Sequence, residues 1–299
     1  MEEKIYYLDN ANTTFLSADV YKKILETYTR CQADEHSIYF LGENSKNEIA
    51  DAKAKVAKAI GASSEEIVFT SGLEESNNWA IKGLAHANMT KGKHIITSVI
   101  EDSSILAACH ELEDEGFKVT YVPVDEFGVV DYAQIIKSIG PDTCLISIGM
   151  ANKEVGTLEP IRAIAELANQ NGVCFHTDAS QAIGAMNINV KDLGVDCMSI
   201  SSQVIGGPKG VGAIYLKEDT KISKLIAGDS KALRAGNLNV PLIAGFGLAI
   251  ENSTTDLDEK VKNVRIVRKY FQKKLSEAVH NIALNGHPIQ RLANNANIM

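Results

Sequence analysis

The chain has 299 residues, of which 45% are hydrophobic and 23% are charged, and its formal net charge is -8. This composition is typical of a globular protein with a large core and excludes a disordered chain. Acidic and basic residues are mixed along the sequence without a basic patch, so neither nucleic acid nor an anionic membrane is expected as a partner.

The N-terminus, MEEKIYYLDN, lacks the basic start and the apolar core of a signal peptide. No apolar run reaches the length that crosses a bilayer, so a cytoplasmic protein is predicted. The five cysteines stand far apart without a CxxC pair, which indicates neither a zinc site nor a disulfide framework. They are expected to be reduced, buried thiols: Cys31, Cys109, Cys144, Cys174 and Cys197.

Strand-like runs alternate with amphipathic stretches along most of the chain. Apolar residues at three- and four-residue spacing predict helices over 46–60, 74–87, 103–116 and 160–171. Short apolar runs predict strands over 66–72, 94–101, 118–124, 144–152, 173–180, 197–202 and 212–216. This order predicts an α/β fold, with a mostly parallel sheet covered by helices on both faces.

Polar residues follow five of the predicted strands, in the sequences TSGLEESNN, EDSS, ANKEVGT, HTDASQ and SSQVIGG. Ligands of parallel-sheet proteins bind at the carboxyl ends of the strands, so these five ends predict one shared pocket. A helix cap is the alternative explanation for any single end, as at Ser71 or Asp102.

The stretch SISSQVIGGPKGVGAIYL (199–216) places a glycine-rich loop between two predicted strands. A nucleotide phosphate loop needs Ser or Thr directly after its lysine, at the start of a helix. Lys209 is followed by Gly210 instead, so the loop is not predicted to bind a nucleotide.

A charged amphipathic helix is predicted around 256–280, and two further strands are expected at 281–288 and 294–299. Its apolar face holds Val261, Val264, Val267, Phe271, Leu275 and Ala278. We therefore divide the chain into an N-terminal segment (1–15), a large domain (16–252) and the start of an incomplete small domain (253–299). An open sheet edge and uncovered apolar surface in the last part are expected to need a partner.

Several motifs, in order and at similar spacing, resemble those of the cysteine desulfurases among the class V aminotransferases. They are YLDNANTT, EIVFTSGLEESNNWAIKG, GKHIITSVIEDSSIL, ANKEVGTLEPI, FHTDASQAIGAMNINVKDLGVD, SISSQVIGGPKGVGAIYL and RAGNLNVP. The resemblance spans essentially the whole chain. It implies the fold type I of pyridoxal phosphate transferases and a dimer with its sites near the subunit interface. It also implies transfer of sulfur from L-cysteine for iron–sulfur cluster or thio-cofactor assembly.

The resemblance assigns cofactor contacts to three residues that match the family. Asp178 stands where the family's carboxylate binds the pyridine nitrogen, and Gln181 where a glutamine bonds the phenolic oxygen. Ser201 matches a serine that contacts the phosphate. The carboxylate matters because it keeps the ring protonated as an electron sink.

Other positions depart from the family pattern. Gln203 stands at the phosphate-binding histidine and Val204 at the Schiff-base lysine, which Lys209 does not replace because the family has that lysine as well. Asp102 stands at the ring-stacking histidine, and an anionic side chain has no aromatic face to stack.

Three further departures concern the phosphate and the neighbouring subunit. Lys153 replaces an asparagine that reaches the phenolic oxygen, and Glu74 replaces a threonine that binds phosphate at a helix N-terminus. Asn237 replaces the threonine that reaches the neighbour's phosphate. The family's sulfur-accepting cysteine and substrate-binding arginine lie beyond the strand that matches 294–299.

These departures leave several alternatives open. Glu74, Asp102, Lys153 and Asp178 form an internal ion-pair network in the place of the cofactor, or they are drift in a disused pocket. Alternatively, Lys153 forms an imine with the cofactor from a new direction.

Three roles are compatible with these residues. The first is a non-catalytic binding or regulatory subunit, as a homodimer or paired with an active paralogue, with a sulfur carrier or iron–sulfur scaffold as a further partner. The second is an enzyme that binds pyridoxal phosphate noncovalently or is completed by a partner chain. The third is a remnant without a role.

Overall fold

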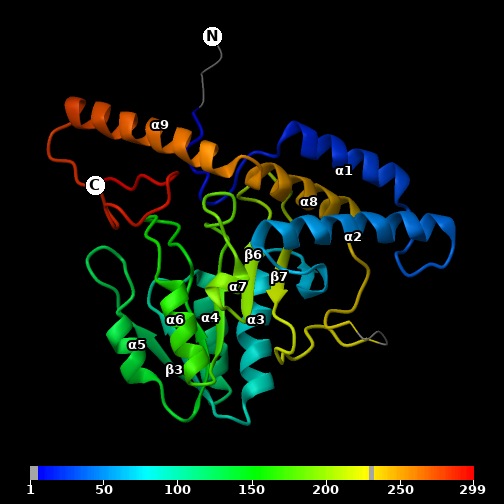
Figure 1. The fold of residues 1–299 in the computed structure, drawn as a ribbon, viewed down its shortest axis with the longest axis horizontal. Coiled ribbons are helices and arrows are strands. Elements are labelled where there is room, and N and C mark those ends of the chain that lie inside the picture. The colour runs from blue at the N-terminus through cyan, green and yellow to red at the C-terminus, as the bar shows by residue number, and fades with distance from the viewer. Residues whose placement is uncertain (1–5, 229–231) are drawn as a thin grey trace.

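The computed structural model describes residues 6–228 and 232–299 (Figure 1). Its described helices are α1 (Ala18–Arg30), α2 (Phe40–Ile60), the 3-10 turn η1 (Ser64–Glu66), α3 (Leu73–Asn88), α4 (Ser103–Asp114), α5 (Tyr132–Ser138), α6 (Ile161–Gln170), α7 (Val190–Leu193), α8 (Val240–Thr254) and α9 (Leu257–Ala278). The strands are β1 (Ile67–Thr70), β2 (His94–Ser98), β3 (Lys118–Val122), β4 (Thr143–Ser147), β5 (Cys174–Asp178), β6 (Cys197–Ser201) and β7 (Gly212–Leu216).

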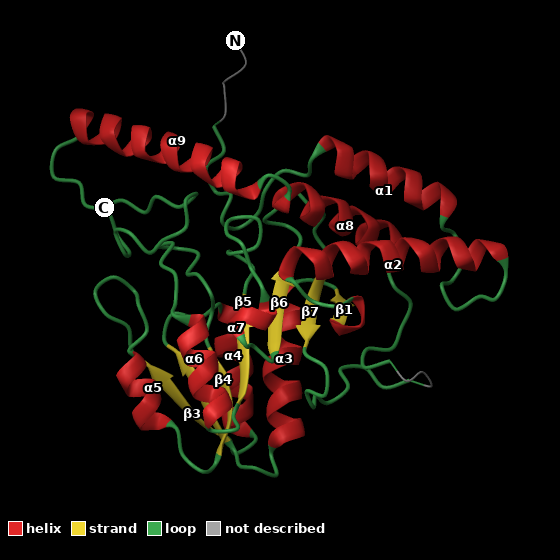
Figure 2. Ribbon diagram, viewed as in Figure 1, coloured by secondary structure: helices red, strands yellow, loops and turns green. Residues whose placement is uncertain are grey.

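The seven described strands form one sheet in the order β1-β7-β6-β5-β4-β2-β3 (Figure 2). Strands β3, β2, β4, β5 and β6 run parallel, whereas β7 pairs antiparallel with both β6 and β1. The predicted α/β fold with a mostly parallel sheet is therefore confirmed, and each of the seven strands predicted between residues 66 and 216 overlaps an observed one.

Helices cover both faces of the sheet. Successive strand residues point to opposite sides, so the apolar residues of one strand contribute to the core on both faces. On β2, Ile96 joins the core cluster beneath α2, α6 and α8, and Ile95 joins the cluster beneath α3 and α4. Phe69 of β1 meets Phe246 of α8 edge to face, with ring centroids 6.2 Å apart. Trp79 of α3 lies in the second cluster and is 1% exposed.

The C-terminal part differs from the prediction in one respect. Helix α9 forms as expected and runs along one end of the molecule (Figure 1), but 281–288 and 294–299 form no named strands. A single antiparallel bridge joins Leu284 to Ile298, so the two predicted strands are wrong. Short runs without a neighbouring strand on their outer side gain too few ladder hydrogen bonds to extend further.

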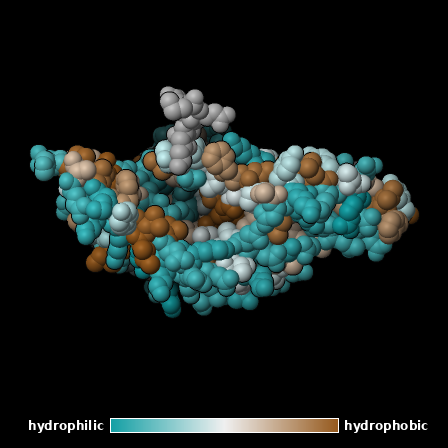
Figure 3. Space-filling view, turned by 90° about the horizontal axis from the view of Figure 1, so that it is seen from above, coloured by the Kyte–Doolittle hydropathy of each residue, from teal (hydrophilic) through white to brown (hydrophobic). Residues whose placement is uncertain are grey.

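Apolar side chains on α9 face outward. Val264 is 40% exposed, Val267 67% and Phe271 46%, as expected for an uncovered apolar face. Seen from above, apolar residues gather at both ends of the molecule (Figure 3). The division into domains stays a prediction, and residues 1–5 of its first segment lie outside the described residues.

The cysteines are free thiols, as expected. Four are buried, and Cys174 is half-buried. Among the described residues, no helix combines the length and the apolar character that crossing a bilayer requires.

Candidate functional site

Three of the polar strand ends meet in one cavity of about 310 Å³ at the carboxyl edge of the sheet. The segments after β2, β4 and β5 line it with Asp102, Lys153, Asp178 and Gln181. Glu74, Ser201 and Gln203 are not among the lining residues. The prediction of one pocket shared by five strand ends is therefore right for three of them and wrong for the other two.

Asp178 is the most enclosed acid of this site. It ends β5, is 7% exposed, and accepts hydrogen bonds at both carboxylate oxygens. The Ser180 backbone N–H donates to Oδ1 at 2.8 Å and the Asn77 amide donates to Oδ2 at 2.9 Å. Burial raises the pKa of the Asp178 carboxyl, while the hydrogen bonds from Ser180 and Asn77 oppose this shift and stabilise the anion.

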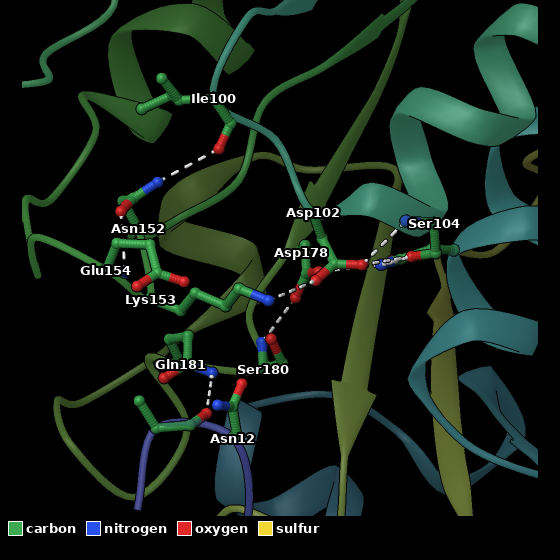
Figure 4. A network of polar contacts seen from close by, with 12 residues as sticks. Asn12, Ile100, Asp102, Ser104, Asn152, Lys153, Glu154, Asp178, Ser180 and Gln181 are labelled. Carbon is green, nitrogen blue, oxygen red and sulfur yellow. Dashed lines mark hydrogen bonds and ion pairs between the residues drawn. The ribbon is translucent and has the colours of Figure 1, made fainter. Parts of the chain in front are cut away.

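Lys153 and Asp102 form the ion pair that the sequence suggested (Figure 4). Lys153 Nζ lies 3.7 Å from Asp102 Oδ2. Asp102 is also the N-cap of α4, since its Oδ1 accepts the Ser104 N–H at 3.0 Å. Both explanations of Asp102 therefore hold together, the helix cap and the pocket.

Glu74 does not belong to an internal network. Its side chain is exposed in the first turn of α3 and makes no hydrogen bond or ion pair with a described residue. The following residue, Glu75, turns inward and pairs with Arg234. The predicted four-residue network is therefore wrong, since Glu74 points to solvent, and of its ion pairs the described residues form that of Lys153 with Asp102. Adjacent residues of a helix point about 100° apart, so Glu75 turns inward where Glu74 does not.

Ser71 is not a helix cap. The N-cap position of α3 belongs to Gly72, and the Ser71 hydroxyl donates to the Glu75 carboxylate at 2.5 Å. The capping alternative for this end is therefore wrong, because the Glu75 side chain reaches back to the Ser71 hydroxyl and to its N–H.

The glutamines Gln181 and Gln203 hold the N-terminal segment. The Gln181 amide donates to the Ala11 carbonyl at 2.9 Å, and the Gln203 amide donates to the Asn12 carbonyl at 3.0 Å. The Thr14 N–H in turn donates to the Gln203 carbonyl at 2.8 Å. Both side-chain amides thus bond to main-chain carbonyls of the segment.

Val204 follows the strand β6, which ends at Ser201. It is half-buried and packs against the larger core cluster. Ser201 is 2% exposed, and Lys209 is exposed. Among the described residues that line the cavity, Lys153 carries the one amine.

Two half-buried glutamates of the cavity were missed at the sequence level. Glu101 accepts the Ser98 hydroxyl at 2.6 Å and the Gly149 N–H at 2.8 Å, and burial raises its pKa to about 8. Glu159 accepts the Val130 N–H at 2.9 Å, and burial raises its pKa to about 7. The acidic pair in the sequence EDSS, Glu101 and Asp102, could have indicated Glu101 as a site residue. Only the fold places Glu159 in the same cavity.

The ion pair carries a testable prediction. Replacing Lys153 with methionine is expected to change the free energy of unfolding by less than about 1 kcal/mol, because the pair is long and partly exposed. Asp102→Ala removes the helix cap as well and is expected to cost about 1 kcal/mol more. Urea unfolding of both variants measures this, and a loss above 2 kcal/mol for Lys153→Met would contradict it.

Residues 6–299 match the aminotransferase class-V family. The cysteine desulfurase IscS of Methanosarcina thermophila is 46% identical, over 99% of this chain and 74% of the relative. The probable mitochondrial cysteine desulfurase of Dictyostelium discoideum is 38% identical, over 99% of this chain and 67% of the relative. A solved NifS-like protein superimposes with a TM-score of 0.93 at 33% identity, over 97% of this chain and 80% of that one.

The chain therefore belongs to the class V aminotransferases, among relatives that are cysteine desulfurases. The family uses pyridoxal phosphate, and its fold type I matches the sheet described above. Asp178 fits the protonated ring nitrogen of that cofactor. Val204 and Gln203 do not fit a covalently held cofactor. Val204 packs against the core without an amine, and the Gln203 amide donates to the Asn12 carbonyl.

Proposed function

We propose that this protein is a cysteine desulfurase-like binding or regulatory subunit that does not release sulfur from L-cysteine by itself. Val204 carries the proposal, because a half-buried valine packed against the core offers no nucleophile at the position of the family's lysine. Covalent catalysis with pyridoxal phosphate needs an amine that exchanges its imine with the substrate. The carboxylates around Lys153 further disfavour an anionic cofactor.

The partner is inferred from exposed apolar side chains on α1, on α2 and on the loop before α2. These residues are Tyr21, Leu25, Tyr28, Ile38, Tyr39, Phe40 and Leu41. Such a patch is typical of a protein–protein interface. We assign it to a second copy or to an active paralogue in the cytoplasm, with a sulfur carrier or iron–sulfur scaffold as a further partner.

A second candidate function is favoured by one observation. Asp178 remains buried and hydrogen-bonded at both oxygens, which suits a noncovalently bound pyridinium ring. In that case a partner chain supplies the missing amine and thiol. The two candidates differ in whether the purified protein holds the cofactor.

The test is a titration of the purified protein with pyridoxal phosphate, followed by borohydride reduction and peptide mass mapping. We expect no adduct at Lys153 and no sulfide release from L-cysteine, while an IscS relative treated alike gives both an adduct and sulfide. An adduct at Lys153 together with sulfide release would overturn the proposal. Saturable binding without an adduct would favour the second candidate.

A further inference from the structure

The cavity at the carboxyl edge of the sheet carries an uneven charge. Lys153 is the one basic side chain among the described residues that line it, and it pairs with Asp102 at 3.7 Å. The wall of the cavity holds more acids than this pair uses, namely Glu101, Asp102, Glu154, Glu159 and Asp178. Within one cavity, such an excess of carboxyl groups favours a cation and disfavours an anion.

Asp178 is enclosed there without a counter-charge. It is 7% exposed, and its hydrogen-bond donors, the Ser180 N–H and the Asn77 amide, are neutral. Figure 4 shows Asp178 beside the pair of Lys153 and Asp102, but the ion pairs between described residues do not include it. Burial and the negative charge of Asp102 both raise the pKa of Asp178. A cation bound beside it would recover part of this cost.

Glu159 offers an oxygen without a donor. Its Oε2 accepts the Val130 N–H at 2.9 Å, whereas its Oε1 is buried and has no hydrogen-bond partner in the part of the chain that the structure describes. A buried carboxylate oxygen without a donor is rare in folded proteins and indicates a missing partner. Glu101 faces the same space, since burial and the charges of Asp178 and Glu159 raise its pKa to about 8.

A second hollow, of about 440 Å³, adjoins the acidic cavity. Ile100, Asn152 and Glu154 line both, so the two spaces share a wall. Phe127 and Val155 add apolar surface to the second hollow, and no basic side chain lines it among the described residues. An acidic end therefore lies next to a space with apolar walls.

We propose that the acidic cavity binds a small primary amine with an apolar body. Its ammonium group pairs with the carboxylates of Glu159 and Asp178, and its body lies against Ile100 and Phe127. A primary amine is protonated near neutral pH, so it carries the charge that this wall selects. The inference rests on the proposed function, because it gives the binding subunit a cationic ligand in the place of the family's anionic cofactor.

Isothermal titration of the full chain with phenethylamine at pH 8 tests the proposal. Burial raises the pKa of Glu159 to about 7, so its carboxyl is mostly ionised at that pH. We expect one molecule to bind per chain. Phenylacetate has the same ring and the opposite charge, and methylamine has the charge without the ring, so each is expected to bind at least about tenfold more weakly.

Two variants change the affinity for phenethylamine in opposite directions. Glu159→Gln keeps an acceptor for the Val130 N–H but removes the charge, so it is expected to weaken binding by about fivefold or more. Lys153→Met removes the internal ammonium group that competes for the same carboxylates, so it is expected to strengthen binding by about threefold or more.

Glu166→Gln is the matched control, because Glu166 is an exposed acid of α6 that does not line the cavity. It is expected to leave binding unchanged, and circular dichroism of each variant verifies the fold. Equal binding by the wild type and Glu159→Gln, or weaker binding by Lys153→Met, would overturn the inference. Phenethylamine binding together with a cofactor adduct and sulfide release contradicts the proposed function alone, whereas the absence of both binding and adduct contradicts this inference alone.

Discussion

Replacing Glu101 with glutamine is expected to reduce a fall in stability that the wild type shows between pH 5.5 and pH 8.5, and to leave the part that Glu159 contributes. Burial raises the pKa of Glu101 from 4.5 to about 8, so the folded protein holds a proton there that the unfolded chain releases. The stabilisation is complete below pH 4.5 and is lost as the pH rises through 8. The expected loss across this interval is about 1–3 kcal/mol.

The measurement is urea unfolding of wild type and variant at several pH values. A neutral amide keeps the hydrogen bonds of Ser98 or Gly149 only in part, so Glu101→Gln is expected to be less stable at pH 5.5 and flatter across the range. Glu154→Gln is the control, since Glu154 is an exposed acid of the same cavity. Parallel pH profiles of Glu101→Gln and wild type would contradict the prediction.

The strands could be predicted from the sequence because buried parallel strands are short apolar runs. The same apolar character makes the exact residues at which each strand begins and ends harder to predict. Helix α8 shows the opposite case. Its sequence PLIAGFGLAI is apolar on nearly all sides and is buried between α1 and α2, so it carries no helical periodicity that would reveal it. Helix α1 was missed as well, although it buries one face with Val20 and Ile24 and exposes the other, so a polar face alone did not guarantee its prediction.

The sequence predicted which positions line the site better than it predicted the directions in which their side chains point. Asp178 and Lys153 line the cavity because one ends β5 and the other follows β4, and these strand ends meet at one edge. Glu74 could not be placed, because the direction of a side chain in a first helical turn depends on where the helix begins, here at Leu73. The raised pKa values of Glu101 and Glu159 depend on burial, which the sequence does not contain.

Replacing Val204 with lysine is expected to let the protein form a borohydride-reducible adduct with pyridoxal phosphate at residue 204, whereas the wild type forms none. The proposed contact of Asp178 with the ring nitrogen is left unchanged by this substitution, and the new lysine would supply the amine that the proposal finds missing. Val204→Met is the control, because methionine has similar length without an amine. Peptide mass mapping after reduction locates the adduct.

Adding Glu74→Thr to Val204→Lys tests the phosphate end of the same site. Thr at the start of α3 removes a negative charge from a helix N-terminus that then binds the phosphate, so the affinity is expected to rise by about three- to tenfold. The gain is modest because Glu74 is exposed and its charge is screened by solvent. If Val204→Lys forms no adduct even with Glu74→Thr, the pairing of Lys153 with Asp102 has closed the site to the cofactor, and Asp178 then serves the structure of the pocket alone.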